Sequence, residues 1–425
     1  MRFNYGKIFL LGFGFFGVSV IWATYNAFVP IFLQDKFGLP PALIGLFMTL
    51  DNIAALFIQP PVGAWSDRLR TPIGRRMPFI LIGAPVAAIA FGIIPVAAIL
   101  PLFVACTTTL LLSMAFWRTP VVALMPDITP SPKRSQANGV INLMGGLGSI
   151  IAFLGGSALY KMNPAYPFWL GSALVILAAI LVFLLIHEPK DYEESADKNP
   201  GMFESLWEVI TDKDHSALRI FLAIFFWFVA YNAVEAFFTL YAKNHLLMNE
   251  ADGTRLLGQL SLLFVIFSLP AGYLGSRIGR RITISVGILI MTACMAMMYI
   301  VPVETLTTVL TKLPILGEVP VVGLILMFAG MAWAFININS LPMVVDMTTL
   351  ARVGTYTGLY YLFSTLAAIA GPNINGLLIQ FSGSNYSITM LAAPIFMVLA
   401  FIMMLGVKRG EAVPQAPAIE GGTVN

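Results

Sequence analysis

Long apolar stretches, separated by short polar segments, fill almost the whole chain. An α-helix needs about 20 residues to cross the hydrocarbon core of a bilayer, which is about 30 Å thick. The pattern therefore predicts an all-α integral membrane protein with twelve transmembrane helices. The expected spans are 8–33, 41–66, 78–98, 101–125, 136–159, 167–187, 217–242, 256–276, 281–301, 320–345, 355–380 and 386–407.

One polar stretch, residues 188–216, is much longer than the others and is rich in acidic residues. It separates an expected N-terminal six-helix bundle over 1–187 from a C-terminal six-helix bundle over 217–407, and we expect it to be a cytoplasmic linker. Within it, Met202–Ile210 has the amphipathic pattern of a short helix lying at the membrane interface. Residues 408–425, rich in Pro, Ala and Gly, are expected to form a disordered cytoplasmic tail.

The placement of Lys and Arg predicts the orientation of the chain. With both termini in the cytoplasm, 18 of the 24 basic residues are cytoplasmic, 5 are external and Arg118 lies in the membrane. Cytoplasmic loops carry the excess of positive charge, so we predict an N-in, C-in protein that crosses the cell's inner or plasma membrane many times. The first apolar stretch is too long for the core of a signal peptide and is expected to be retained as the first helix.

Composition excludes several classes of protein. The chain is 58% hydrophobic and 11% charged, whereas soluble domains contain about 25% charged residues. Its net charge of +3 is too small to indicate a nucleic-acid partner. Cys106 and Cys294 both fall inside expected spans, so neither a structural disulfide nor a thiolate metal site is expected. No phosphate loop, zinc-ligand spacing or nucleophile elbow occurs, so we expect neither an enzyme nor a bound metal or cofactor.

Matching landmarks indicate an internal duplication. Tyr25-Asn26-Ala27 recurs as Tyr231-Asn232-Ala233, and Gly63 corresponds to Gly272. Asp127 and Gly139 recur as Asp346 and Gly358 with the same spacing of twelve residues. These landmarks keep their order along the chain, which predicts two six-helix halves in parallel repeat, the layout of major facilitator transporters.

A charged segment, Gly63–Arg76 (GAWSDRLRTPIGRR), joins the second and third expected helices, and Gly272–Arg281 (GYLGSRIGRR) is a weaker copy of it. Two hypotheses stay open: the segment is a cytoplasmic latch between conformational states, or it only anchors the topology by positive charge. Ser276 replaces Asp67 in the second copy, so a latch that depends on an acid is expected to be stronger in the N-terminal half. The latch candidates are Gly63, Asp67, Arg68, Gly74, Arg75, Arg76, Asp127, Arg277, Arg280 and Arg281.

Three charged residues are expected deep in the membrane: Asp51, Arg118 and Glu235. A charged side chain there is costly, and it usually faces a wet cavity and marks an ion or substrate path. Asp51 is our candidate for the reversible proton carrier, the alternative being a structural acid. Arg118 is either a partner for a carboxylate or sugar hydroxyls, or a side chain that snorkels to the cytoplasmic interface. Glu235 is a candidate ligand contact, external gate or interfacial acid.

Polar and aromatic residues are concentrated in several of the same helices. Each alone is more often a hydrogen-bonding residue between packed helices, but together they predict a central cavity suited to a polyhydroxylated ligand. The cavity candidates are Trp22, Tyr25, Asn26, Gln59, Asn142, Asn232, Asn337, Asn339, Tyr360, Asn373 and Asn375.

Two segments resemble a known family. Gln59-Pro60 followed by GAWSDRLRTPIGRRMPFI resembles the region between the second and third helices of sucrose transporters, in which Gln-Pro, Ser-Asp-Arg and Gly-Arg-Arg precede Pro-Phe-Ile. Arg118-Thr119-Pro120, with Ala123-Leu124 and Asp127, resembles the end of that family's fourth helix. The region from Phe116 to Thr129 is also similar to melibiose-type glycoside carriers. The match is specific in the N-terminal half and extends only to superfamily features in the C-terminal half, as in a divergent microbial member.

The resemblance implies uptake of a glycoside, in particular a disaccharide, coupled to protons, with sodium as the alternative ion. The chain also departs from the family pattern. Sucrose carriers have an acid in the middle of the fourth helix, where this chain reads CTTTLLLSMAF, and melibiose carriers have acids near the positions of Ala55 and Gln59. Asp51, one turn before Ala55, is therefore our candidate for the coupling acid.

Three functions remain open from the sequence. The first is a proton-coupled sugar symporter that works as a monomer by alternating access. The second is a proton-driven exporter of hydrophobic or cationic compounds, in which Asp51 and Glu235 recognise the cation. The third is a membrane sensor that kept the fold without transporting, although neither the linker nor the tail is long enough for an obvious signalling domain.

Overall fold

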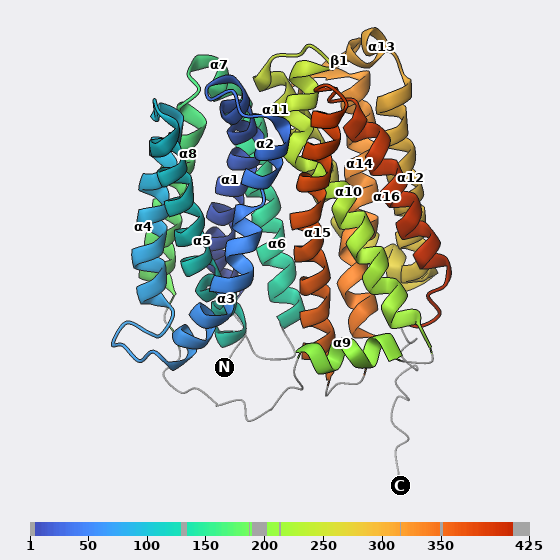
Figure 1. Ribbon diagram of the computed structural model, residues 1–425. Helices are drawn as coiled ribbons and strands as arrows, with labels where there is room; N and C mark the ends of the chain where they lie inside the picture. Colours follow the sequence, from blue (N-terminus) through green and yellow to red (C-terminus); the bar gives the residue numbers. More distant parts are fainter. Residues whose placement is uncertain are drawn as a thin grey trace.

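A computed structural model describes residues 5–128, 134–186, 188, 202–211, 214–314, 316–348 and 352–410. Twelve helices in this part of the chain are long and apolar enough to cross a membrane. They form two groups that stand side by side, with the helices running from one end of the molecule to the other (Figure 1). The predicted all-α membrane architecture with two six-helix groups is therefore confirmed.

The N-terminal group contains six spans, two of which are interrupted. Its elements are α1 (Tyr5–Asp35), α2 (Pro41–Phe47) with α3 (Leu50–Arg68), α4 (Met77–Ile93), α5 (Leu100–Ile128), α6 (Arg134–Ile150) with α7 (Gly156–Met162), and α8 (Tyr166–Leu185). A π-helical segment, Ile151–Gly155, joins α6 to α7, and a 3₁₀ turn, Ile94–Val96, follows α4.

The C-terminal group repeats this order without a comparable break in its second span. Its spans are α10 (Ser216–Asn244), α11 (Glu250–Ile278), α12 (Arg280–Ile300), α14 (Val321–Val345), α15 (Val353–Phe381) and α16 (Ile388–Leu405). Between α12 and α14, the short helix α13 (Val303–Thr307) precedes an antiparallel hairpin of β1 (Val309–Leu313) and β2 (Gly317–Pro320). The expected spans leave these residues unassigned.

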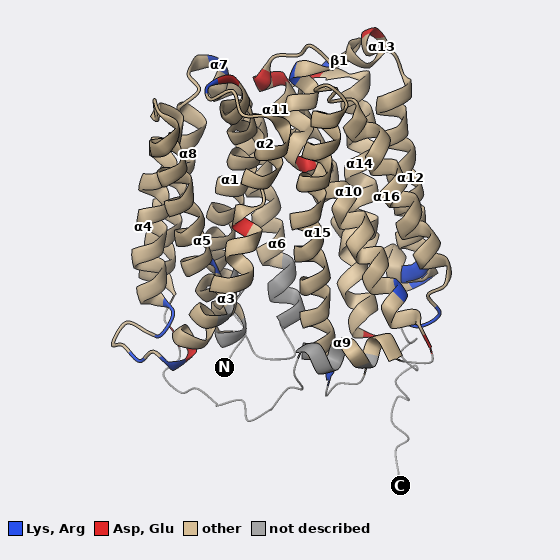
Figure 2. Cartoon of the chain, in the orientation of Figure 1, with Lys and Arg blue, Asp and Glu red and all other residues tan. Residues whose placement is uncertain are grey.

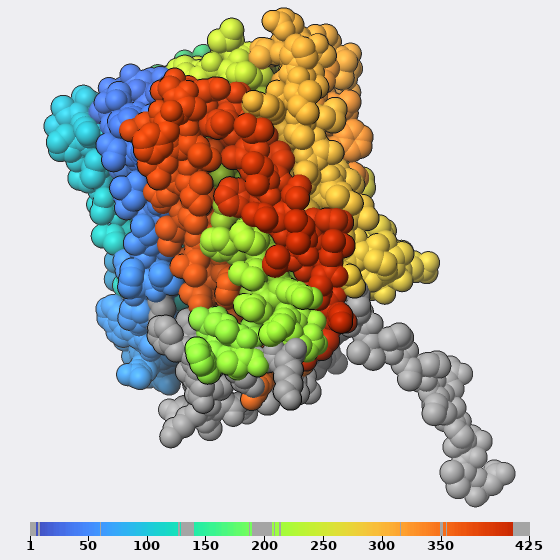
Figure 3. All heavy atoms as spheres, turned by 45° about the vertical axis from the view of Figure 1, so that its right-hand side comes forward, coloured from blue at the N-terminus to red at the C-terminus, as the bar shows by residue number. Residues whose placement is uncertain are grey.

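The short helix predicted at Met202–Ile210 is confirmed as α9 (Met202–Thr211). It lies across the end of the bundle beneath α10 and α15 (Figures 1 and 3). Val209 is buried in the core, whereas Trp207 is 69% exposed. This combination fits an amphipathic helix whose outer aromatic side chain reaches the interface.

The start of α1 and the end of α16 lie at the same end of the bundle as α9 (Figure 1). Lys and Arg also gather at this end, on the segment between α3 and α4 and near the start of α12 (Figure 2). The positive-inside rule therefore makes this end cytoplasmic, in agreement with the predicted orientation.

Corresponding glycines pack in the same way in the two halves. A Cβ atom added at Gly63 on α3 would lie 3.5 Å from Thr119 on α5, and one at Gly272 on α11 would lie 3.5 Å from Ile338 on α14. Gly272 and Ile338 are the positions that the sequence landmarks align with Gly63 and Thr119. The duplication inferred from the landmarks thus reappears as matching contacts between the second and fourth spans of each half.

Candidate functional site

The second span breaks immediately before its acidic residue. The structure ends α2 at Phe47 and begins α3 at Leu50, which corrects the expectation of one continuous helix over 41–66. The Thr49 hydroxyl donates to the Leu46 carbonyl at 2.8 Å, a local bond that competes with helical pairing. Since neither Gly nor Pro occurs at the break, the local sequence does not predict it.

Because of this break, Asp51 lies in the first turn of α3. The first turn of a helix presents unpaired N–H groups and a partial positive charge, which stabilise a carboxylate. Asp51 also accepts a hydrogen bond from the Asn52 side chain at 2.9 Å. Figure 2 shows red, acidic positions on the ribbon of the N-terminal half and on that of the C-terminal half, partway along the bundle and away from its charged ends.

The three intramembrane charges are brought together. Arg118 on α5 interacts electrostatically with Asp51 and, across the two halves, with Tyr361 on α15. Glu235 on α10 interacts electrostatically with Asp51 and accepts a hydrogen bond from Asn26 on α1. Arg118 therefore lies close to a carboxylate, one of the two kinds of partner expected for it from the sequence.

Two aromatic donors on α1 accompany this group. Tyr25 is buried and lies close enough to Asp51 to interact electrostatically with it. Its hydroxyl and the indole N–H of Trp22 have no hydrogen-bond partner within the described part of the chain. The two rings meet edge to face with centroids 5.9 Å apart. Since buried polar groups normally have partners, these donors are suited to a ligand or to water.

A cluster of aromatic rings lies in the C-terminal half. Tyr231 on α10 and Trp333 on α14 are stacked with centroids 3.9 Å apart and planes within 5°. Phe228 meets Trp333 edge to face at 5.4 Å. The sequence prediction missed Trp333 and Tyr361, because an aromatic residue in an apolar span is most often ordinary packing.

The remaining cavity candidates differ in their burial and in their hydrogen-bond partners. Asn373 donates to the Thr49 hydroxyl at 3.1 Å and so joins α15 to the break in the second span. Asn232 bonds the carbonyl of Phe228 on its own helix at 2.7 Å. Gln59 and Asn337 are half-buried, and Asn142 is exposed on α6.

Three others hold helices together. Asn339 donates to the Ala271 carbonyl at 3.0 Å and fixes α14 against α11. Tyr360 shares a hydrogen bond of 3.0 Å with Ser340. Asn375 donates to Thr389 at 3.1 Å. All three are buried, and their hydrogen bonds join neighbouring helices of the C-terminal half.

The cytoplasmic segment between α3 and α4 is held by Glu188, which follows the last residue of α8, Leu185, by three positions. The Arg76 side chain is buried and binds Asp67 and the Ser66 hydroxyl. The Glu188 carboxylate accepts backbone hydrogen bonds from Arg75, Arg76 and Met77, each at 2.9 Å, and so caps the start of α4. Arg68 is exposed at the end of α3.

In Gly272–Arg281, the C-terminal copy of this segment, an arginine side chain binds a different acidic residue. Arg280 binds Asp346 and donates to the Pro342 carbonyl at 3.0 Å. Arg281 donates to the Leu405 carbonyl at 2.6 Å, and Arg277 lies over the Tyr273 ring at 4.8 Å. The C-terminal half therefore also holds a cytoplasmic ion pair, although Ser276 stands in the position of Asp67. The side chain of Asp127, the counterpart of Asp346, lies outside the described residues.

The outer ends of the two halves are joined by what we call the outer gate, formed by Gln34, Asp35 and Lys161 with Lys243, Asn244 and Asp252. Lys161 binds Asp252 at 2.8 Å, and Lys243 binds Asp35. Gln34 and Asn244 exchange hydrogen bonds at 3.2 and 3.0 Å. The structure therefore represents a state in which the external entrance is shut.

Close backbone contacts seal the same end. The Ser157 hydroxyl donates to the Ala251 carbonyl at 2.6 Å. A Cβ atom at Gly45 would lie 2.4 Å from the Pro372 carbonyl oxygen, so only glycine allows α2 to approach α15 this closely. Burial lowers the pKa of His245, at the outer end of α10, so this imidazole is neutral at pH 7 and adds no charge to the outer gate.

No group of three or more His, Cys, Asp or Glu side chains within the described ranges is placed to hold a metal ion. Cys106 and Cys294 are both buried and unpaired with each other. The described side chains of the site offer charge pairing, hydrogen bonding and aromatic stacking beneath a closed outer entrance.

Curated relatives match parts of this chain. The sucrose transport protein SUC3 of Arabidopsis thaliana is 28% identical over 174 residues, covering 36% of this chain and 29% of the relative. The sucrose transport protein SUT2 of Oryza sativa subsp. japonica is 24% identical over 251 residues, covering 49% and 50%. The proton-associated sugar transporter A of Homo sapiens is 43% identical over 68 residues, covering 16% and 9%. The chain thus spans at most half the length of these relatives.

Solved structures match over nearly the whole chain. A bacterial homologue of the human lysosomal transporter Spinster, in an inward-facing and occupied conformation, superposes with a TM-score of 0.73 at 14% identity, covering 94% of this chain and 95% of the homologue. A mutant of the nucleoside transporter NupG gives a TM-score of 0.73 at 16% identity, covering 95% and 100%. At these identities the likeness shows the fold.

The family model of the Major Facilitator Superfamily matches residues 11–311 and 256–424. The two matches overlap and together extend over nearly all of both helix groups. With its twelve apolar helices, duplicated halves and this family match, the chain is a multi-pass membrane transporter that belongs to the Major Facilitator Superfamily.

Proposed function

We propose that this transporter takes up a glycoside, such as a disaccharide, together with protons by alternating access, and that Asp51 carries the proton. The observation that carries the proposal is the position of Asp51, in the first turn of a broken helix and within electrostatic reach of Arg118 and Glu235. An acid in such a place can bind and release a proton while its charged form is balanced by neighbouring groups.

The interaction between Arg118 and Asp51 depends on whether Asp51 is ionised or carries a proton. When Asp51 is ionised, the guanidinium and the start of α3 both attract it and hold α3 toward α5. When a proton neutralises Asp51, Arg118 loses that partner and its five N–H donors become free for ligand hydroxyls. Ligand and proton then favour the same state, which is the thermodynamic requirement for coupling.

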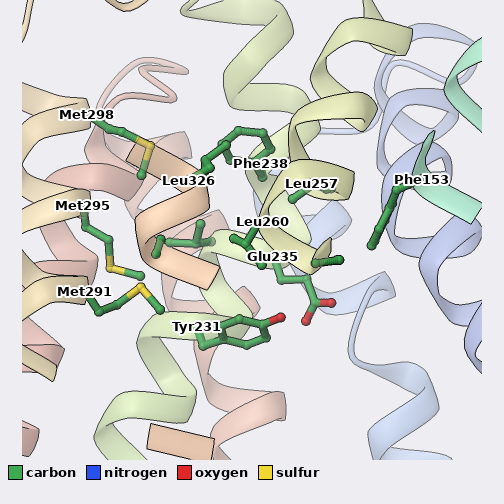
Figure 4. Close-up of a pocket in the computed structure, with 13 residues that line it drawn as sticks. Phe153, Tyr231, Glu235, Phe238, Leu257, Leu260, Met291, Met295, Met298 and Leu326 are labelled. Atoms are coloured by element: carbon green, nitrogen blue, oxygen red, sulfur yellow. The ribbon is translucent and has the colours of Figure 1, made fainter. Parts of the chain in front are cut away.

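The surrounding groups suit a sugar. Asn26 and Glu235 offer an amide and a carboxylate for hydroxyls, and Tyr25 offers a phenol that has no partner among the described residues. Tyr231, whose ring is held by stacking on Trp333, lines the pocket beside Glu235 and adds an aromatic group next to that carboxylate (Figure 4). The names of the curated relatives, two sucrose transport proteins and a proton-associated sugar transporter, support the same class.

One observation favours a second function. Glu235 borders a pocket whose other walls include Phe238 and Met295, and a carboxylate beside aromatic and thioether groups also suits a lipophilic cation. In that case the chain exports such cations in exchange for protons.

Transport by the purified protein in proteoliposomes separates the two functions. We expect labelled disaccharides or methyl glycosides to accumulate when the inward proton gradient is imposed, and to equilibrate without accumulation when it is absent. A sodium gradient of equal size is the control for the coupling ion. Efflux of a lipophilic cation without transport of any sugar would overturn the proposal in favour of the exporter.

A further inference from the structure

The two parts of the second span pack against different halves of the protein. The outer part, α2, lies mainly along α15 of the C-terminal half, whereas the inner part, α3, lies mainly along α5 of its own half. The break at Met48–Thr49 falls between these two parts. A movement that separates the halves at their outer ends therefore acts on α2 and α3 unequally, and the break lies where the two helices meet.

Contacts with α15 hold α2 along its length. The Gln380 side chain accepts a hydrogen bond at 3.3 Å from the Ala42 N–H, in the first turn of α2. Gly376 on α15 repeats the close approach of Gly45, because a Cβ atom at Gly376 would lie 2.5 Å from the Pro41 carbonyl oxygen. The two helices thus meet backbone to backbone, and α2 keeps these contacts only while α15 stays beside it.

The last contact of this series is at the break itself. Thr49 is fully buried, and its hydroxyl accepts a hydrogen bond from the Asn373 amide at 3.1 Å while donating to the Leu46 carbonyl at 2.8 Å. A second bond, 2.7 Å to the Ile369 carbonyl, fixes the Asn373 side chain on its own helix. The hydroxyl of Thr49 therefore joins the end of α2 to the C-terminal half.

The break is a small departure from regular helix. Met48 has φ −71° and ψ −3°, and Thr49 has φ −110° and ψ −3°. An α-helix has ψ of about −42°, so a rotation of about 40° at each residue would join α2 to α3. Since the segment contains neither Gly nor Pro, the local sequence allows a continuous helix. The contact with α15 is what keeps the two parts separate.

The break also decides which groups Asp51 can bond with. Its carboxylate accepts hydrogen bonds from its own backbone N–H and from that of Asn52. In a continuous helix these two N–H groups would instead bond with the carbonyls of Phe47 and Met48, four residues earlier. The carboxylate would then lose two donors and the positive end of the helix dipole. The broken span therefore favours ionised Asp51, and a continuous span favours the protonated form.

The other charged and titratable groups around Asp51 lie on other elements. They are Tyr25 on α1, Arg118 on α5 and Glu235 on α10, and Tyr361 on α15 lies beside Arg118. All four are retained in the variants described below. A change in the titration of Asp51 in those variants therefore reports on the break.

We propose that Thr49 and Asn373 are positioning residues that keep the second span broken while the outer ends are together, and that opening of the outer end joins α2 to α3. The proposal rests on the proposed role of Asp51 as the proton carrier. With the outer end open, Asp51 lies inside a continuous helix and takes a proton from the external water. With the outer end shut, Asn373 restores the break, and the proton leaves Asp51 for water on the cytoplasmic side.

The test titrates Asp51 in the purified full-length protein by infrared spectroscopy in lipid nanodiscs, which requires no sugar. The signal is the carbonyl stretch of a protonated carboxyl group that is lost when Asp51→Asn is added to the same protein. Thr49→Val removes the hydroxyl and keeps the shape of the side chain, and Asn373→Leu removes the amide from the other half. We expect the midpoint of the band to rise by about 0.5 pH unit in each, a threefold change in proton affinity.

Two further variants separate positioning from a general loss of packing. Thr49→Ser keeps the hydroxyl and should restore the wild-type midpoint. Asn375→Leu is the matched control, because the Asn375 amide on the same helix also donates to a threonine hydroxyl at 3.1 Å, that of Thr389, within the C-terminal half. It should lower the melting temperature and keep the wild-type midpoint. A wild-type midpoint in Thr49→Val or Asn373→Leu, or an equal rise in Asn375→Leu, would overturn the proposal.

Opening the outer end by another route should have the same effect on Asp51. Lys161→Asp disrupts the ion pair with Asp252 and should raise the midpoint in the same direction as Thr49→Val. Adding Asp252→Lys restores an ion pair and should return the midpoint toward the wild-type value. A wild-type midpoint in Lys161→Asp protein whose outer ends have moved apart would show that Asp51 does not respond to the outer end, and would overturn the proposal.

Failure of the proposed function has a different signature. If the wild-type protein and Asp51→Asn have the same carboxyl band at every pH, Asp51 carries no proton, and the coupling role and the positioning role fail together. If Asp51 titrates but its midpoint does not respond to Thr49→Val and Asn373→Leu, only the positioning role is overturned. Should one of these two variants not fold, the other makes the same comparison from the opposite half.

Discussion

At the scale of single residues, the charged side chains form two groups that differ in their place in the bundle and in their partners. Asp51 lies within electrostatic reach of both Arg118 and Glu235 inside the bundle. Arg76 and Arg280 bind acids at the cytoplasmic end, each within its own half. The first group can change its interactions with a proton or a ligand, and the second stabilises the ends of helices that move as units.

Glu188 gives a residue-level prediction. Replacing it with Ala removes the acceptor for three backbone N–H groups at the start of α4, and a lost helix cap costs about 1–2 kcal/mol. We expect the melting temperature of the detergent-solubilised protein to fall by about 1–2 °C. Glu188→Gln keeps one acceptor and should fall between the variant and the wild type. A melting temperature for Glu188→Ala equal to that of the wild type would show that the cap does not stabilise the fold.

The charged residues in the membrane could be singled out from the sequence because such residues are costly and therefore rare. The sequence did not show which polar residues lie beside these charges in the fold. Asn339 and Tyr360 look like Asn26 and Tyr25 in the sequence, but they point between helices, and that direction depends on the packing of the whole bundle. Glu188 was one of several acids in a polar linker, and only the fold brings it to α4.

At the scale of helices, length and hydropathy were enough to place all twelve spans, because an apolar stretch of this length has few alternatives. Two departures from regular helix were not predictable in this way. The break at Met48–Thr49 and the π-helical segment Ile151–Gly155 both occur without proline, and they depend on side-chain bonds and inter-helix contacts. Both lie in elements that meet the C-terminal half.

At the scale of the molecule, the two halves are joined at their outer ends by charges of opposite sign, which suggests a direct test of the outer gate. Lys161→Asp places two acids together and should push the outer ends apart, because like charges in contact repel. Adding Asp252→Lys restores an ion pair with its polarity reversed and should close the gate again.

Spin labels on Met162 and Phe381, both exposed at the outer ends of opposite halves, report the distance between those ends. We expect the mean distance to increase in Lys161→Asp and to return toward the wild-type value in the double variant. An unchanged distance in Lys161→Asp would show that this ion pair does not hold the gate shut.

The central claim is that a proton on Asp51 drives accumulation of the ligand. It is tested most directly by measuring Asp51→Asn in proteoliposomes in two modes, uptake driven by a proton gradient and exchange of labelled for unlabelled sugar. Glu235→Gln is the comparison, since loss of a ligand contact should weaken both modes together. For Asp51→Asn we predict exchange at close to the wild-type rate with no accumulation above equilibrium, because asparagine keeps the shape of the site but cannot carry the proton. Accumulation equal to that of the wild type in Asp51→Asn would contradict the account.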